Sequence, residues 1–134
     1  MFAGKRPTNL GVQNGSLAPC PNTPNCVNSQ STNPISQIEP LTYNSTGTQA
    51  IADLKTVIHN LERTTIVTEN SNYLHAEFKS ALMGYVDDVE FYLDEAQQVI
   101  HVRSASRLGK SDLGVNRKRI ETIRAKLQAL QNQS

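Results

Sequence analysis

Proline confines regular structure to the later part of this chain. All six prolines lie within its first 40 residues, a stretch that is also rich in Asn, Ser, Thr and Gly. Proline lacks a backbone donor and fixes φ, so helix interiors and central strands exclude such a mixture. We therefore predict that residues 1–46 form an irregular, extended strap and that residues 47–134 form a single α+β domain. Spaced apolar residues from Leu10 to Leu41 favour a strap that lies across the folded body over a disordered tail.

Composition limits the class of protein. Hydrophobic residues make up 37% of the 134 positions and aromatic residues 5%, with no Trp, which suggests one domain with a mainly aliphatic core. No run approaches the roughly 18 apolar residues of a membrane helix, and the first residues lack the apolar region of a secretory signal. We expect a soluble protein without membrane insertion. The net charge of +1 argues against a nucleic-acid partner.

Apolar periodicity predicts the elements of the domain. Residues 47–62 carry apolar side chains at helical spacing, with Thr48 as the expected cap. Residues 65–68, 73–80, 86–93 and 99–106 read as four strands joined by short turns. A last helix should start at Asn116 as its N-cap, with Val115 and Ile120 as a hydrophobic staple. The fold class is therefore α+β: a four-stranded antiparallel meander with two helices on one face and the extended N-terminal strap.

The two cysteines, Cys20 and Cys26, lie in a proline-bent stretch of the strap. Their C-x5-C spacing does not fit the usual zinc knuckles. A disulfide, a pair of reduced structural thiols, and redox or metal chemistry all remain open, and a disulfide would need an oxidising compartment.

Charge is segregated along the chain. Residues 51–99 carry nine acidic and three basic residues, a net charge of −6, and residues 100–134 carry eight basic and two acidic residues, a net charge of +6. Short turns would place Asp88 opposite both Lys79 and Arg103 on the outer face of the sheet. The same register would gather Glu77, Glu90 and His101, weak candidates for acid–base catalysis or for holding a divalent metal. The alternative is a solvated sheet face.

Asp87 lies on the opposite, core-facing side and needs a cationic partner there. We expect that partner to be Arg107, Arg117 or Arg119. The first turn of the last helix is basic, against the helix dipole, so an anion should compensate it. Asp87, Asp112 and a bound phosphate or carboxylate are the alternatives.

Four blocks of the chain, residues 17–30, 73–80, 87–91 and 103–120, resemble the domain-of-unknown-function family 1499 in sequence and order. Residues 4–12 resemble its cyanobacterial and plastid branch. The family has no established activity, and its relatives in chloroplasts imply a setting at photosynthetic membranes. The resemblance singles out as motif members Asp87, Asp88, Glu90, Arg103, Arg107, Asp112, Asn116 and Arg119.

Two functions compete at this point. The favoured one is a small binding or accessory module, without cofactor, that docks an anionic ligand or an acidic protein partner. Its binding residues would be Arg103, Arg107, Asn116, Arg117 and Arg119. The absence of a nucleophile elbow, P-loop, HExxH motif or dinucleotide fingerprint supports it. The alternative is a metal-assisted or acid–base enzyme that uses the Glu77, Glu90 and His101 cluster. The strap could also mediate assembly; oligomeric state and compartment, cytoplasmic or thylakoid-associated, stay open.

Overall fold

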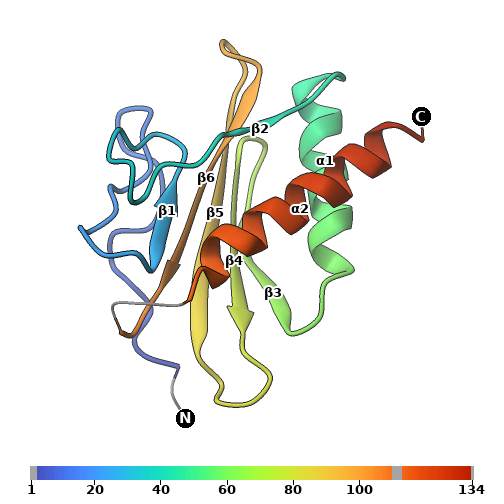
Figure 1. The fold of residues 1–134 in the computed structure, drawn as a ribbon. Helices are drawn as coiled ribbons and strands as arrows, with labels where there is room; N and C mark the ends of the chain where they lie inside the picture. Colours follow the sequence, from blue (N-terminus) through green and yellow to red (C-terminus); the bar gives the residue numbers. More distant parts are fainter. Residues whose placement is uncertain (1–2, 110–112, 134) are drawn as a thin grey trace.

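The computed structural model describes residues 3–109 and 113–133 and has two layers, a twisted antiparallel sheet and two helices on one of its faces (Figure 1). The helices are α1 (Gly47–His59) and α2 (Val115–Gln131). Four strands form the predicted meander: β3 (Thr64–Glu69), β4 (Tyr73–Lys79), β5 (Val86–Asp94) and β6 (Val99–Ser106). The predicted α+β class is confirmed, with helices and strands close to the expected bounds.

The strap adds two short strands that the sequence analysis did not predict. β1 (Cys26–Asn28) pairs with the end of β6, and β2 (Leu41–Thr42) pairs with its beginning, so the sheet has six strands within the described residues. Strands of two or three residues between prolines carry too little periodicity to be recognised. They cover the β6 edge, which would otherwise expose unpaired backbone groups.

The strap also contributes to the hydrophobic core. Val27, Ile38 and Leu41 are buried against side chains of both helices and of the central strands. Phe91 of β5 and Ile100 of β6 lie fully buried in the same cluster. The division into a strap of residues 1–46 and a single domain of residues 47–134 stays a prediction.

Both helices begin differently from the prediction. Thr46, not Thr48, caps α1, because its hydroxyl accepts a hydrogen bond from the Gln49 amide at 3.1 Å. Gly114, in the left-handed region with φ 81°, precedes α2. Asn116 is therefore not the N-cap; it lies inside the first turn and points to the sheet, where it is fully buried. Val115 is exposed, so the predicted staple is also wrong.

Candidate functional site

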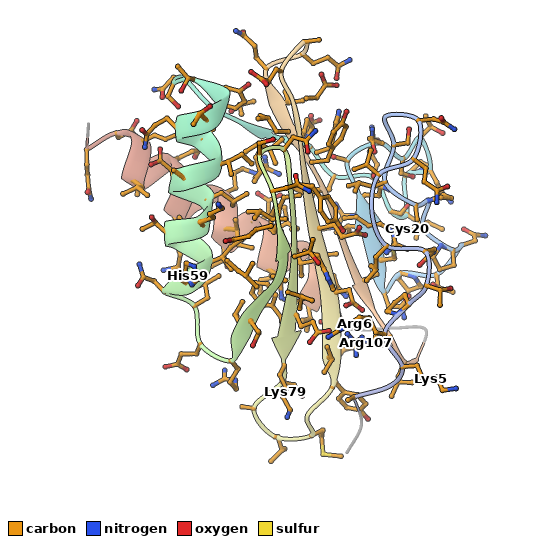
Figure 2. All side chains as sticks on the ribbon, turned by 180° about the vertical axis from the view of Figure 1, so that it is seen from behind. Lys5, Arg6, Cys20, His59, Lys79 and Arg107 are labelled. Atoms are coloured by element: carbon orange, nitrogen blue, oxygen red, sulfur yellow. A yellow bond between two sulfur atoms is a disulfide. The ribbon has the colours of Figure 1, made fainter. Side chains whose placement is uncertain are left out.

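The sheet face opposite the helices is charged, yet most of it is buried. Along β4, β5 and β6, side chains that alternate with the core-facing ones point to this side, and the strap contacts several of them, whereas Lys79 at the end of β4 stays exposed. Asp88 is 1% exposed, Glu90 0% and Arg103 5%. Figure 2, which views the sheet from this side, shows Arg6 of the strap beside Arg107 at the lower part of the sheet. The solvated-face alternative is therefore wrong.

The strand register differs from the expected one by two residues, which keeps each side chain on its face but changes its partner. Glu90 lies opposite Arg103, and Asp88 lies opposite Ala105. On the other side, Glu77 faces Asp88. The predicted pairing of Asp88 with Lys79 or Arg103 is wrong.

The guanidinium of Arg107 is the centre of the observed network. It donates to both carboxylate oxygens of Asp88, at 2.8 and 2.9 Å, and to Glu77 Oε2 at 2.6 Å. Arg6 reaches the same Glu77 oxygen at 2.7 Å, and His75 Nε2 lies 2.8 Å from Asp88 Oδ1. Burial alone would raise the pKa of the Asp88 carboxyl, but the hydrogen bonds from Arg107 and His75 outweigh it and hold that pKa below its usual value.

Glu90 forms a second, deeper part of the network. Its Oε2 accepts from the Tyr73 hydroxyl at 2.5 Å and from the Gly11 amide of the strap at 2.7 Å. Its Oε1 has no hydrogen-bond partner among the described residues; the nearest Arg103 nitrogen is 3.9 Å away. Arg103 Nε likewise lacks an acceptor within residues 3–109 and 113–133. Burial raises the pKa of the Tyr73 hydroxyl, and the hydrogen bond to Glu90 adds to that shift.

The predicted catalytic trio of Glu77, Glu90 and His101 is not assembled. His101 lies opposite Tyr92, its Nδ1 is 3.1 Å from Ser29 Oγ, and its Nε2 is 3.7 Å from Asp94. Burial lowers the pKa of the His101 ring. Each member of the trio thus has its own, separate partners.

A different trio comes together instead, and it has the donor types of a metal site. His75, Glu77 and Asp88 each offer a ligand atom, all within 4.8 Å of one another. Arg107 already binds both carboxylates, and a divalent cation would have to displace it. The cluster is better explained as an ion-pair network than as a metal centre.

A pocket of about 340 Å³ opens beside this network, between the strap, the loop closed by Cys20 and Cys26, and the ends of β5 and β6. The two cysteines form a disulfide, with their Cα atoms 5.7 Å apart. Arg103 donates to the Pro19 carbonyl at 3.3 Å, and Asn25 donates to the Gly109 carbonyl at 2.7 Å, so the loop is tied to the sheet. The residues that carry the argument below all line it: Asn9, Thr23, Asn25, Asp88, Arg103 and Arg107.

The predicted anion-binding residues are split between the two faces of the sheet. Arg119 lies on the helix side, where it pairs with Asp87 at 2.8 Å and lies over the Phe78 ring at 4.9 Å. Arg117 instead donates to the carbonyls of Gln37 and Ile35, at 2.8 and 3.2 Å. The structure therefore does not bring all five residues together on one surface, and their binding of an anion stays a prediction.

Asn116 takes part in this helix-side group. Its carbonyl oxygen accepts from the Ser104 hydroxyl at 2.5 Å and from Arg119 at 2.9 Å, and its amide donates to Asn25 and Ser106. Asp112 lies outside the described residues. Asn116 therefore connects α2 to the sheet rather than facing a ligand.

Sequence reasoning missed three participants of the network: Arg6, Tyr73 and His75. The alternation along β4 does place Tyr73 and His75 on the charged face, so their position was available. Arg6 gave no signal, because an irregular strap has no period from which to place a side chain.

Comparison with known proteins gives one match. A family model described as "Protein of unknown function (DUF1499)" matches residues 16–127. No curated protein and no solved structure matches the chain. In the described ranges, neither helix is long and apolar enough to cross a membrane. The match covers most of the sequence, so the chain belongs to the DUF1499 family.

Proposed function

We propose that this protein is a non-enzymatic binding module that holds a small anion, a carboxylate or a phosphate, in the pocket lined by Arg103 and Arg107. The observation that carries the proposal is Arg103, a buried guanidinium at the pocket wall without a hydrogen-bonded carboxylate among the described residues. Its nearest one, on Glu90, is 3.9 Å away, and its Nε has no acceptor among the described residues.

A buried guanidinium without close compensation is costly. Removal of a cation from water disfavours its charged form, and burial accordingly lowers the pKa of Arg103. Arg107, by contrast, has two carboxylates in direct contact. An anion in the pocket would give Arg103 the charge-assisted hydrogen bonds that Arg107 already has.

The size and composition of the pocket fit a small ligand. About 340 Å³ lies at the lower end of the roughly 300–1,000 Å³ typical of small-molecule sites. Thr23, Asn25 and Asn9 add polar groups to its wall, and the disulfide fixes the loop that carries two of them. The acidic groups nearest the pocket accept hydrogen bonds from arginines or from Tyr73, which favours binding over proton transfer. An acidic protein partner and a setting at photosynthetic membranes stay predictions of the sequence analysis.

The test is an NMR titration with sodium phosphate and, separately, sodium acetate, at constant ionic strength. We expect saturable shifts of the backbone amides of Asn25 and Ala105 in the unmodified protein. Arg103→Gln should abolish saturation, whereas Arg63→Gln, at an exposed arginine away from this pocket, should not. The spectrum of each variant reports whether it is folded.

Two results would contradict the proposal. One is a linear, unsaturated response to both anions in the unmodified protein. The other is an identical affinity in a folded Arg103→Gln variant, because the anchoring charge would then be unnecessary. Arg103→Lys keeps the charge and provides a second variant if Arg103→Gln does not fold.

A further inference from the structure

A second pocket lies on the other side of the sheet, at the end where the β4–β5 loop, the end of β6 and the start of α2 come together (Figure 1). Its volume is about 490 Å³, within the roughly 300–1,000 Å³ range of small-molecule sites. None of the residues that hold the Arg107 network lines it. It shares Ser106 and Gly109 with the anion pocket proposed above but none of that pocket's arginines.

The wall of this pocket is apolar and open to solvent. Eight large hydrophobic side chains are exposed among the described residues, and half of them line this one pocket: Tyr85, Leu108, Leu113 and Val115. Leu113 is 94% exposed. Scattered single apolar residues on a surface need no explanation, but a concentration of them around one cavity marks a binding site.

The charged part of the pocket is an ion pair. Asp87 and Arg119 both line it and contact each other at 2.8 Å, and their side chains are 11% and 16% exposed. Ser106 and Ser80 add hydroxyl groups. Because the two charges neutralise one another, a charged ligand group would meet one attractive and one repulsive partner. An uncharged group that both donates and accepts hydrogen bonds satisfies both.

We propose that this pocket binds an uncharged amphipathic small molecule, with its apolar body against Tyr85, Leu108, Leu113 and Val115 and its hydroxyl or amide head at the Asp87–Arg119 pair. The apolar walls supply the driving force, because they leave water on binding. The ion pair supplies the selection against charged heads, because a misplaced buried charge is costly.

Three probes that share an eight-carbon chain and differ in the charge of the head group test this selection. The probes are 1-octanol, sodium octanoate and octylammonium chloride, each titrated into the full chain below its solubility limit. The readout is the methyl NMR signals of Leu108 and Val115, with the exposed Val67 of β3, which does not line the pocket, as the internal control. We expect 1-octanol to bind about tenfold more tightly than either charged probe, with Val67 unaffected.

Two variants should change the selection in opposite directions. In Asp87→Asn the charge of Arg119 loses its partner at the pocket, and octanoate should become the preferred probe. In Arg119→Gln the charge of Asp87 loses its contact with the Arg119 guanidinium, and octylammonium should be preferred. Asp53→Asn, at a partly exposed aspartate on α1 that does not line the pocket, is the matched control and should keep the preference for 1-octanol.

Three outcomes of the titrations would overturn the proposal, and a fourth concerns the protein alone. The three are no saturable shift with any probe, an affinity that does not depend on the head group, and the same order of affinities in folded Asp87→Asn as in the unmodified protein. Concentration-dependent shifts of Leu108 and Val115 without a probe would assign the pocket to a second copy of this chain, and that result would overturn it as well. Failure here leaves the anion proposal intact, because that proposal is read from the amides of Asn25 and Ala105.

Discussion

Asp88 is the acidic group on which the covered face of the sheet depends most. Its carboxylate accepts both hydrogen bonds of the Arg107 fork and lies against His75, all in a region that the strap seals from water. The replacement Asp88→Asn keeps the size and removes the charge. Among the described residues, Arg107 would then keep only Glu77 as a direct anionic partner.

The size of the effect follows from the burial of the pair. The side chains of Asp88 and Arg107 are 1% and 7% exposed, and the loss of one member of a buried pair costs about 3–5 kcal/mol. The neighbouring Asp87 pairs with Arg119 through side chains that are 11% and 16% exposed. For Asp87→Asn we expect about 1.5–3 kcal/mol, the range for a hydrogen bond to a charged group. We therefore expect Asp88→Asn to lose more unfolding free energy than Asp87→Asn, whereas a solvated outer face would make the loss for Asp88→Asn the smaller one.

The pH dependence has a defined sign. Since the folded-state pKa of Asp88 is lowered, its contribution is fully present above the unfolded pKa of about 3.9 and is lost as the pH falls through the lower, folded value. Asp88→Asn cannot titrate at this position. The difference in unfolding free energy between the two proteins should therefore be constant from pH 7 to about pH 5 and should shrink below about pH 4.

The assay is urea unfolding of the unmodified protein, Asp88→Asn, Asp87→Asn and the partly exposed control Asp53→Asn, at pH 7 and at steps down to pH 3. A loss below about 1 kcal/mol for Asp88→Asn would refute the reasoning, because that is the size of an exposed pair. So would a loss no larger than that of Asp87→Asn, or a difference that grows as the pH falls.

Three further predictions follow from other parts of the structure. Reduction of the Cys20–Cys26 disulfide should lower the unfolding free energy by about 2 kcal/mol, from the entropy of its short loop, as measured by urea unfolding with and without dithiothreitol; an unchanged midpoint would contradict it. Asn116→Ala should cost about 2–4 kcal/mol in the same assay, since it removes four hydrogen bonds to buried and partly buried partners, whereas Asn132→Ala at the end of α2 should cost under about 1 kcal/mol. Gly47→Ala should destabilise by about 1–3 kcal/mol despite the better helix propensity of Ala, because the added Cβ would lie 2.9 Å from a Leu93 methyl; a higher melting temperature would show that the contact relaxes freely.

Periodicity predicted which face of the sheet each side chain occupies. The alternation along β4 and β5 placed Phe78, Val89 and Phe91 towards the helices and Glu77 and Asp88 away from them, as observed. A strand has a period of two, so any error of two residues in the register leaves these assignments unchanged. The fold class and the two-layer order were predictable for the same reason.

The register between the strands was not predictable, because the turns set it. The last pair of β5 and β6 at their turn is Asp94 opposite Val99, whereas the expected register pairs Leu93 with Gln98. Gln98 lies in the left-handed region, with φ 57°. The last pair of β4 and β5 at their loop is Lys79 opposite Val86, whereas the expected register pairs Ala81 with Val86 across a shorter loop. Non-glycine residues at positive φ are uncommon, and a sequence does not mark them. Each turn therefore moved the partners by two residues and separated Glu77 from His101.

The strap changes the chemistry of the charged face more than the register does. On a solvated face, Glu77, Asp88 and Glu90 would be ordinary surface carboxylates with weak, screened pairs. The strap brings Arg6 to Glu77 and the Gly11 amide to Glu90, and it removes the water that would otherwise hydrate them. The low exposure of Arg103 follows from the same cover. The charged pattern in the strands thus becomes a site only where an irregular segment lies across it, and that segment is the part of the chain for which periodicity gives no position.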